Sequence, residues 1–330
     1  MAARTALPLS RIIVLLAVGA LIAGSATASE RSITDQLKRM SAAMRSLSYE
    51  GTLVYLHDDR LETLHIVHRI ENGRVHERIV SLNGPVRTVT REQDEVTCEL
   101  ANSNPFSVRR HGGTLDLLRS TGFDPNTLSS HYLIHPLGRA RVAGRQTDVV
   151  GVIPRDDLRY GYRFYLDVDT GLPLKSDLMG QLPEPIEQVM FTALSLLPAG
   201  DAPASKITDA PDAEGPRAKA SPRTEAVAAD EDPWRFVSLP AGFSLVMRDH
   251  WQDVSGRPVQ HFVLSDGLAS VSVYVENGDQ DGLQGATRIG AIHAAGGRVA
   301  GHQVTIVGEV PPSTVEAVLA GIRYEGHDTP

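Results

Sequence analysis

The chain has 330 residues, of which 22% are charged, and a formal net charge of −8 at pH 7. This acidic balance argues against non-specific attraction to nucleic acid or to anionic lipid headgroups. The single cysteine, Cys98, excludes an internal disulfide. A chain of about 300 residues is longer than one compact core usually holds, so two domains are expected.

The N-terminus has the pattern of a secretory signal peptide. Arg4 and Arg11 give it a basic start, residues 12–22 are apolar, and Ala26-Thr27-Ala28 offers a small-x-small cleavage site. The apolar run is shorter than the roughly 20 residues that span a bilayer, which argues against a membrane anchor. We therefore expect export and cleavage after Ala28, so that residues 1–28 are the signal peptide.

The segment that follows predicts an amphipathic helix. Five apolar residues lie on one face at helical spacing: Ile33, Leu37, Met40, Met44 and Leu47. Ser32 has the side chain of a helix N-cap and stands just before this stripe. The helix is therefore expected to begin at Ser32 and to bury the Met-rich face.

After Leu47 the apolar period changes to two, which predicts strands. Asp58-Asp59 and Asn72-Gly73 lie between the first strands and are typical hairpin turns. Strands continue to Leu100, resume near Leu133 and run to Leu194. A meander this long must curl to bury its inner face. Residues 29–197 are thus expected to form an unclosed antiparallel barrel wrapped around helices, the second helix being Thr114–Arg119.

The region 198–233 differs from the rest of the chain. It contains six Pro, ten Ala and no aromatic residue, so it cannot bury enough apolar area to offset its ordering entropy. We expect a Pro/Ala-rich linker there. Residues 234–326 then predict a smaller domain with strands at 245–248, 259–264, 268–275 and 304–310, followed by a helix. Ser313 and Glu316 have the spacing of a capping box for that helix.

The predicted fold class is therefore α+β with two domains, the second an antiparallel sheet with one packed helix. No catalytic constellation accompanies it. His261, Ser265 and Asp266 are the residue types of a hydrolase triad, but no nucleophile elbow or Gly-rich oxyanion loop surrounds them. We expect no enzyme activity and no cofactor.

Metal binding is not indicated either. His65 and His68 have an odd spacing, which places them on opposite faces of a strand. Asn277 to Gly282 matches the first half of a calcium loop, but Arg288 stands where the bidentate glutamate belongs.

Two surfaces remain as candidate binding sites. An apolar cleft that accepts an acyl chain would be lined by Met40, Met44, Leu47, Leu53, Leu64 and Ile66. An anion-binding patch would be formed by Arg109, Arg110, Arg139, Arg141 and Arg145. The alternative for the first set is ordinary core packing, and for the second set solvated strand edges.

Five segments of the chain resemble the RseB/MucB family. Three of them belong to its N-terminal domain and two to its C-terminal domain: Gly84–Arg87, Gly138–Arg145, Tyr160–Asp177, Ser265–Val273 and Gly301–Val310. The resemblance covers nearly the whole chain after the signal peptide, and only the long linker departs from it. The family's large domain is similar to periplasmic lipoprotein carriers, in agreement with the open barrel expected from the strand pattern.

This resemblance implies a periplasmic negative regulator of the envelope-stress sigma factor. Such a protein binds the periplasmic domain of a membrane anti-sigma factor and protects it from regulated proteolysis, until lipoprotein or lipopolysaccharide acyl chains relieve the protection. The resemblance implies no nucleic-acid partner, and whether the protein forms a homo-oligomer is left open. The alternatives are a periplasmic lipoprotein carrier or chaperone, which leaves the second domain without a role, and an envelope hydrolase, which needs a nucleophile and base that are not evident.

Overall fold

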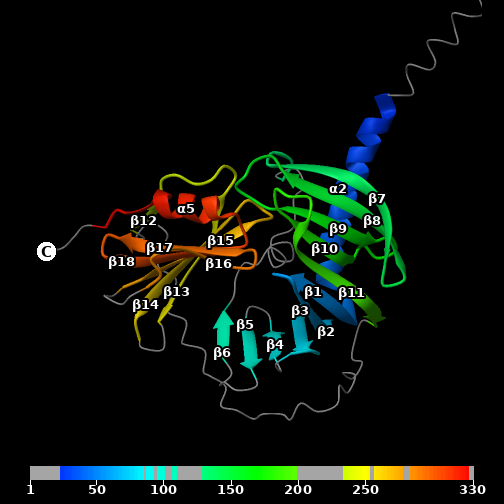
Figure 1. Cartoon of the computed structure of the whole chain (residues 1–330), viewed down its shortest axis with the longest axis horizontal. Helices are drawn as coiled ribbons and strands as arrows, with labels where there is room; N and C mark the ends of the chain where they lie inside the picture. The colour runs from blue at the N-terminus through cyan, green and yellow to red at the C-terminus, as the bar shows by residue number, and fades with distance from the viewer. Residues whose placement is uncertain are drawn as a thin grey trace, which may run out of the picture.

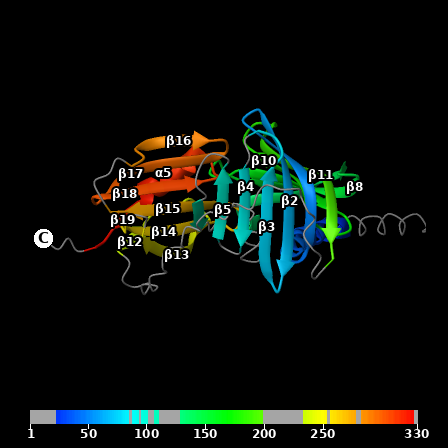
Figure 2. The same ribbon diagram turned by 90° about the horizontal axis from the view of Figure 1, so that it is seen from below.

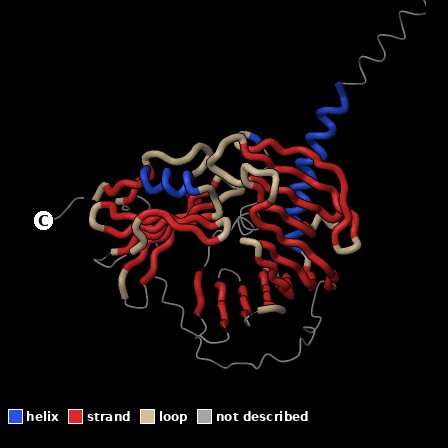
Figure 3. The backbone as a smooth tube through the Cα atoms, viewed as in Figure 1, coloured by secondary structure: helices blue, strands red, loops and turns tan. Residues whose placement is uncertain are grey.

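The computed structural model describes residues 23–84, 87–92, 95–100, 106–109, 128–198, 233–252, 256–277 and 282–326. Strands dominate these ranges, and two helices, α2 and α5, accompany them (Figure 3). A large and a smaller antiparallel sheet lie side by side (Figure 1). The predicted α+β fold with two sheets is therefore confirmed.

Within the described residues the large sheet has eleven strands, in the order β6-β5-β4-β3-β2-β1-β11-β10-β9-β8-β7. Its strands are β1 (Ser48–His57), β2 (Arg60–Glu71), β3 (Arg74–Ser81), β4 (Arg87–Glu92), β5 (Glu95–Leu100), β6 (Phe106–Arg109), β7 (Tyr132–Val142), β8 (Arg145–Pro154), β9 (Gly161–Asp167), β10 (Pro173–Met179) and β11 (Pro185–Leu197). The first strand pairs with the last, β1 with β11, while β6 and β7 are the outer strands of the sheet. The sheet is curved but not closed, as the strand pattern predicts.

Turn chemistry fixes the first two hairpins. Asp58 and Asp59 have φ angles of 46° and 58°, and Asn72 and Gly73 have φ angles of 50° and 73°. Two successive left-handed residues match the right-handed twist of the flanking strands, and Asp, Asn and Gly adopt this conformation most readily. At the centre, a Cβ on Gly51 would lie 2.5 Å from the carbonyl oxygen of Ala193, so the close pairing of β1 with β11 requires glycine there.

Helix α2 (Ala23–Ser46) crosses the concave face of the large sheet (Figure 1). Ile33, Leu37, Met40 and Met44 are all buried, so the predicted face is correct. The predicted N-cap at Ser32 is wrong, because the helix is already formed at Ala23. Residues 23–31 contain three alanines and no proline, and alanine has the highest helix propensity, so nothing stops the helix at Ser32.

The smaller sheet has six strands in the order β13-β14-β15-β18-β17-β16, and β12 pairs with β19 beside it. The bounds are β12 (Trp234–Phe236), β13 (Ser244–Gln252), β14 (Pro258–Ser265), β15 (Ser270–Glu276), β16 (Gly285–Ile289), β17 (Ile292–Val299), β18 (His302–Gly308), α5 (Pro312–Gly321) and β19 (Ile322–Tyr324). Helix α5 packs on β17 and β18, as expected. Strands β16 and β17 were not predicted, because the centre of β17 is Ala-Ala-Gly-Gly, which has low β propensity.

The predicted capping box of α5 is wrong. The N-cap is Pro311, and no side chain caps the helix. Ser313 instead donates its hydroxyl to the carbonyl oxygen of Asp157 at 3.3 Å, and Thr314 donates to the carbonyl oxygen of Leu158. These hydroxyls attach the start of α5 to the loop between β8 and β9, so tertiary contact replaces local capping.

Some predictions fall outside the described residues: the helix at Thr114–Arg119 and almost all of the linker 198–233. None of the helices in the described ranges has the length and hydropathy of a membrane-spanning segment.

Candidate binding cavity

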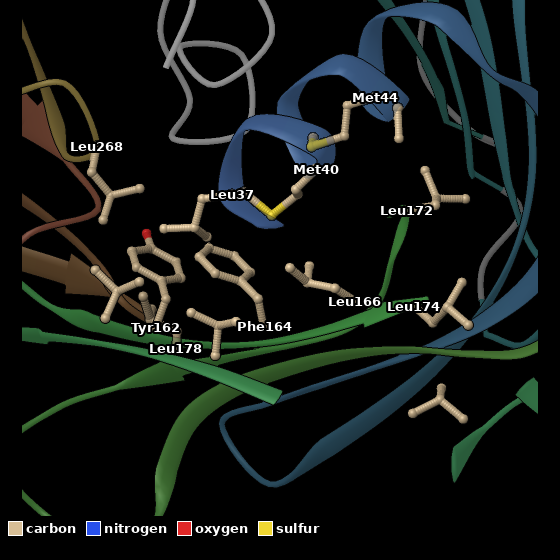
Figure 4. Close-up of a cluster of buried hydrophobic side chains, with 14 of the residues drawn as sticks. Leu37, Met40, Met44, Tyr162, Phe164, Leu166, Leu172, Leu174, Leu178 and Leu268 are labelled. Atoms are coloured by element: carbon tan, nitrogen blue, oxygen red, sulfur yellow. The ribbon is translucent and has the colours of Figure 1, made fainter. Parts of the chain in front are cut away.

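An apolar cavity of about 180 Å³ lies between α2 and the concave face of the large sheet. It is lined by Met40, Met44, Tyr49, Leu53, Ile66, Tyr162, Phe164, Leu172, Pro173, Leu174, Lys175, Ser176, Leu178, Glu187, Val189, Phe191 and Glu309. Figure 4 shows Met40 and Met44 on the helix, with Phe164 and Leu174 from the strands and Leu172 from the turn before β10 around the same space. Thioethers and aromatic rings give the cavity a wall that adapts to apolar ligands.

Four of the six predicted cleft residues line this cavity: Met40, Met44, Leu53 and Ile66. Leu47 and Leu64 are partly buried and pack against the same apolar cluster without lining the cavity. The positions agree with the predicted cleft, and the acyl-chain ligand stays a prediction.

The opposite wall of the cavity was not predicted. It comes mostly from β9, β10 and β11, and its centre is Tyr162 and Phe164, whose rings stack at 5.3 Å. Tyr162, Phe164 and Leu166 alternate along β9 and share the buried face. This alternation was readable in the sequence, but only the pairing of β1 with β11 brings β9 and β10 around to face the Met residues of α2.

Two carboxylates stand among the apolar lining residues, Glu187 from β11 and Glu309 from the end of β18. Tyr55 donates its hydroxyl to Glu187 Oε2 at 2.6 Å, and the backbone N–H of Ala291 donates to Oε1 at 3.0 Å. Burial raises the pKa of Tyr55 above its ordinary value, and the hydrogen bond to Glu187 adds to this, so Tyr55 stays a neutral donor. Burial, followed by the charge of Glu309, raises the pKa of Tyr160 to about 12. This side of the cavity is thus polar and acidic.

The predicted anion patch is placed only in part by the structure. Arg139 is 75% exposed and its Nε lies 3.0 Å from Asp148 Oδ1, while Arg141 donates to the carbonyl oxygen of Gly144 at 3.2 Å. The Arg109 side chain and all of Arg110 lie outside the described residues. The anion-binding role stays a prediction.

Arg145 has a structural partner. Its guanidinium makes two hydrogen bonds to Asp167, at 2.9 and 2.8 Å. Burial raises the pKa of the Asp167 carboxyl, but hydrogen bonds from Arg145 and Thr170 outweigh burial and hold this pKa below its ordinary range. The pair ties the start of β8 to the end of β9, so Arg145 is less available to an external anion than Arg139 or Arg141.

The residues weighed for other chemistry have structural roles. His65 lies 3.3 Å from Glu50, and His68 lies 2.8 Å from Glu77 on the opposite face of β2. Within the described ranges, no three His, Cys, Asp or Glu side chains come together as metal ligands. Ser265 donates to the carbonyl oxygen of Ala269 at 2.8 Å and accepts the Gly267 N–H, so its hydroxyl shapes a turn.

A buried junction between the two sheets was missed by sequence reasoning; we use this name for Tyr132, Arg159 and Asp266. The Arg159 guanidinium lies 2.6 Å from Asp266 Oδ2, and both side chains are 0% exposed. Tyr132 donates its hydroxyl to the same oxygen at 2.8 Å. Burial lowers the pKa of Arg159, but the hydrogen bond to Asp156 and the charge of Asp266 outweigh burial and raise it above its ordinary value. Figure 2 shows the smaller sheet lying beside the large sheet.

Comparison with known proteins agrees with this architecture. The MucB/RseB N-terminal domain profile matches residues 32–214, and the MucB/RseB C-terminal domain profile matches residues 228–323. The sigma factor AlgU regulatory protein MucB of Pseudomonas aeruginosa is 35% identical over 332 residues, covering 94% of this chain and 96% of MucB. The sigma-E factor regulatory protein RseB of Escherichia coli K12 is 27% identical over 291 residues, covering 87% of this chain and 89% of RseB.

Solved structures extend the similarity to three dimensions. MucB in the complex structure of Pseudomonas aeruginosa MucA/MucB has a TM-score of 0.64 and 32% identity, covering 89% of this chain and 99% of that chain. A crystal structure of MucB has a TM-score of 0.61 and 34% identity, covering 92% of this chain and 99% of that chain. Because both domain profiles match and the similarity to MucB spans almost the whole chain, this protein belongs to the MucB/RseB family.

Proposed function

We propose that this protein binds the periplasmic part of a membrane anti-sigma factor and so restrains an envelope-stress sigma factor. The observation that carries the proposal is the similarity, over 89% of this chain, to MucB in its complex with MucA. The bound protein protects the anti-sigma factor from regulated proteolysis, and the sigma factor stays sequestered. This role uses binding alone and assigns no catalytic residue.

The cavity is the proposed sensor of an envelope signal. Its apolar lining suits the acyl chain of a lipoprotein or a lipopolysaccharide. Binding of the acyl chain would relieve the protection of the anti-sigma factor. A carrier or chaperone of lipoproteins is the second candidate, which the cavity also favours. Deleting the gene separates the two, because loss of a carrier mislocalises lipoproteins, whereas loss of the regulator raises expression of the sigma-factor regulon.

The binding proposal predicts a direct and protective complex. A labelled periplasmic segment of the cognate anti-sigma factor is titrated with the purified protein. Cleavage of the segment by the envelope protease that degrades the anti-sigma factor is followed in parallel. We expect saturable binding and slower cleavage of the segment. A scrambled segment of the same composition is the control. Equal cleavage of the native segment with and without saturating protein would exclude the protective role.

We also propose that the protein works in the periplasm after cleavage at Ala28, with domains at 29–197 and 234–326 joined by the linker 198–233. The basic start, the apolar run and the cleavage motif support export. Sequencing the N-terminus of the protein from a periplasmic extract is expected to give Ser29 as the first residue. An intact N-terminus at Met1 in the membrane fraction would exclude cleavage.

A further inference from the structure

The tip of the β16–β17 hairpin docks beside the cavity. Gly290 and Ala291 form its two-residue turn, between the paired Ile289 and Ile292, and Gly290 has a φ angle of 59°. The Ala291 side chain is 0% exposed and belongs to the same apolar cluster as Met40 and Met44. The tip of a hairpin from the smaller sheet is therefore buried against the large sheet.

The carboxylate of Glu187 binds this tip. Glu187 accepts the Ala291 N–H at 3.0 Å and the Tyr55 hydroxyl at 2.6 Å, one on each oxygen, and it also lines the cavity. A Cβ on Gly290 would lie 2.8 Å from Glu187 Oε1, so the contact depends on glycine in the turn. Glu187 is thus both a wall of the cavity and an attachment point of the hairpin, beside the longer contact of His293 in β17 with the Tyr160 hydroxyl at 3.4 Å.

The hairpin can leave this position without separating the two sheets. The buried junction uses Arg159, Tyr132 and Asp266, and Asp266 lies in the turn before β15 rather than in the hairpin. The start of α5 adds the contact of Ser313 with Asp157. Loss of the Glu187–Ala291 bond therefore leaves these contacts in place.

The cavity size favours such an opening when a long chain binds. Its volume of about 180 Å³ is below the roughly 300–1,000 Å³ of typical small-molecule sites. A long acyl chain fits only if part of the lining moves. The β16 strand that leads into the tip is exposed along its whole length and lies at the edge of the smaller sheet, whereas β17 also pairs with β18. Movement of the tip and of β16 therefore disturbs fewer buried contacts than movement of β17 would.

We propose that Glu187 couples filling of the cavity to release of the β16–β17 hairpin. An acyl chain that enlarges the cavity next to Glu187 displaces the Ala291 N–H from the carboxylate. The docked hairpin in turn weakens binding of the acyl chain. The two effects are equal in size, because linkage between two binding equilibria is reciprocal. This inference rests on the proposed ligand role of the cavity, and it names Glu187 as a positioning residue through which the smaller sheet responds to the ligand.

The test is Glu187→Gln in the full mature chain. Glutamine has one carbonyl oxygen and no charge, so the Tyr55 hydroxyl and the Ala291 N–H can no longer each donate to a carboxylate oxygen of their own. We expect hydrogen exchange of the Ala291 amide, measured by NMR, to become about tenfold faster or more, since a hydrogen bond to a charged group is lost. The affinity for monomyristoylglycerol, an uncharged acyl probe measured by calorimetry, should rise. Glu184→Gln, the same change on an exposed turn near β11, is the matched control and should change neither quantity.

The wild-type protein gives the decisive comparison. Saturating monomyristoylglycerol should speed exchange at Ala291 in wild type and add little in Glu187→Gln. If the lipid binds wild type and Ala291 stays equally protected, the coupling through Glu187 is wrong, while the cavity keeps its ligand role. If the lipid does not bind, both the coupling and the acyl-chain role of the cavity are wrong, and the anti-sigma binding proposal is decided separately by the labelled-segment titration.

Discussion

Replacing Arg159 with methionine is expected to lower the free energy of unfolding by about 3–5 kcal/mol, because it leaves a buried carboxylate without its cation. Asp266 Oδ2 accepts from Arg159 and Tyr132, and Oδ1 accepts the N–H groups of Leu268 and Ala269 at 2.9 and 2.7 Å. After the substitution only these neutral donors remain around a side chain with 0% exposure. Urea unfolding of the mature protein measures the loss.

An exposed ion pair of the same type is the control. Arg139 pairs with Asp148 at 3.0 Å but is 75% exposed, so Arg139→Met should cost under about 1 kcal/mol. The double variant Arg159→Met with Asp266→Leu removes both buried charges and should recover part of the loss, although the turn amides of Leu268 and Ala269 lose their acceptor. Equal losses for Arg159→Met and Arg139→Met would show that the junction contributes no more than a surface pair.

The second large effect concerns the two proposed ligands. Saturating acyl lipid is expected to weaken binding of the anti-sigma segment by about 5- to 150-fold, the usual range of coupling between two sites on one protein. The reason is that a filled cavity favours an arrangement of the smaller sheet different from the docked one. Titrating the labelled segment with and without monomyristoylglycerol measures this ratio.

Variants on one strand separate the cavity from the surface. Ile66 lines the cavity and is 6% exposed, so Ile66→Glu should abolish the lipid response while leaving segment binding nearly intact. Leu61 lies on the same strand and is 57% exposed, so Leu61→Glu should leave the lipid response unchanged. Ile66→Thr is the milder variant if Ile66→Glu does not fold. Identical segment affinity at zero and saturating lipid in wild type would show that the sites are independent.

Local features of the sequence were enough to predict most of the strands, the first hairpin turns and the buried face of the first helix. The Asn72-Gly73 and Asp58-Asp59 turns have the left-handed conformations that their residue types favour. Met40 and Met44 are buried because helical spacing puts them on the stripe of Leu37. These properties depend on neighbours a few residues away, so a single sequence contains them.

The candidate site was half predictable for the same reason. Met40 and Met44 come from α2, and Leu53 and Ile66 come from the first two strands that follow it. Their periodicity marks them as inward-facing. The wall opposite them comes from strands more than a hundred residues later in the chain, and the register between β1 and β11 decides which of those side chains they meet. Pairing over such a separation depends on the whole sheet and has no local pattern.

The sequence by itself determined the strand-rich composition and the inward face of α2. The domain division around the Pro/Ala-rich region stays a prediction from the sequence. Only the tertiary structure decided how the two sheets meet. Arg159 and Asp266 are residue types that are common in loops, and Ser313 has the position of a local helix cap. In the structure all three bind across the boundary between the two sheets. The physical reason is that a buried charged or hydroxyl side chain must have a hydrogen-bond partner. The folded chain decides which partner comes within reach, and spacing along the sequence does not.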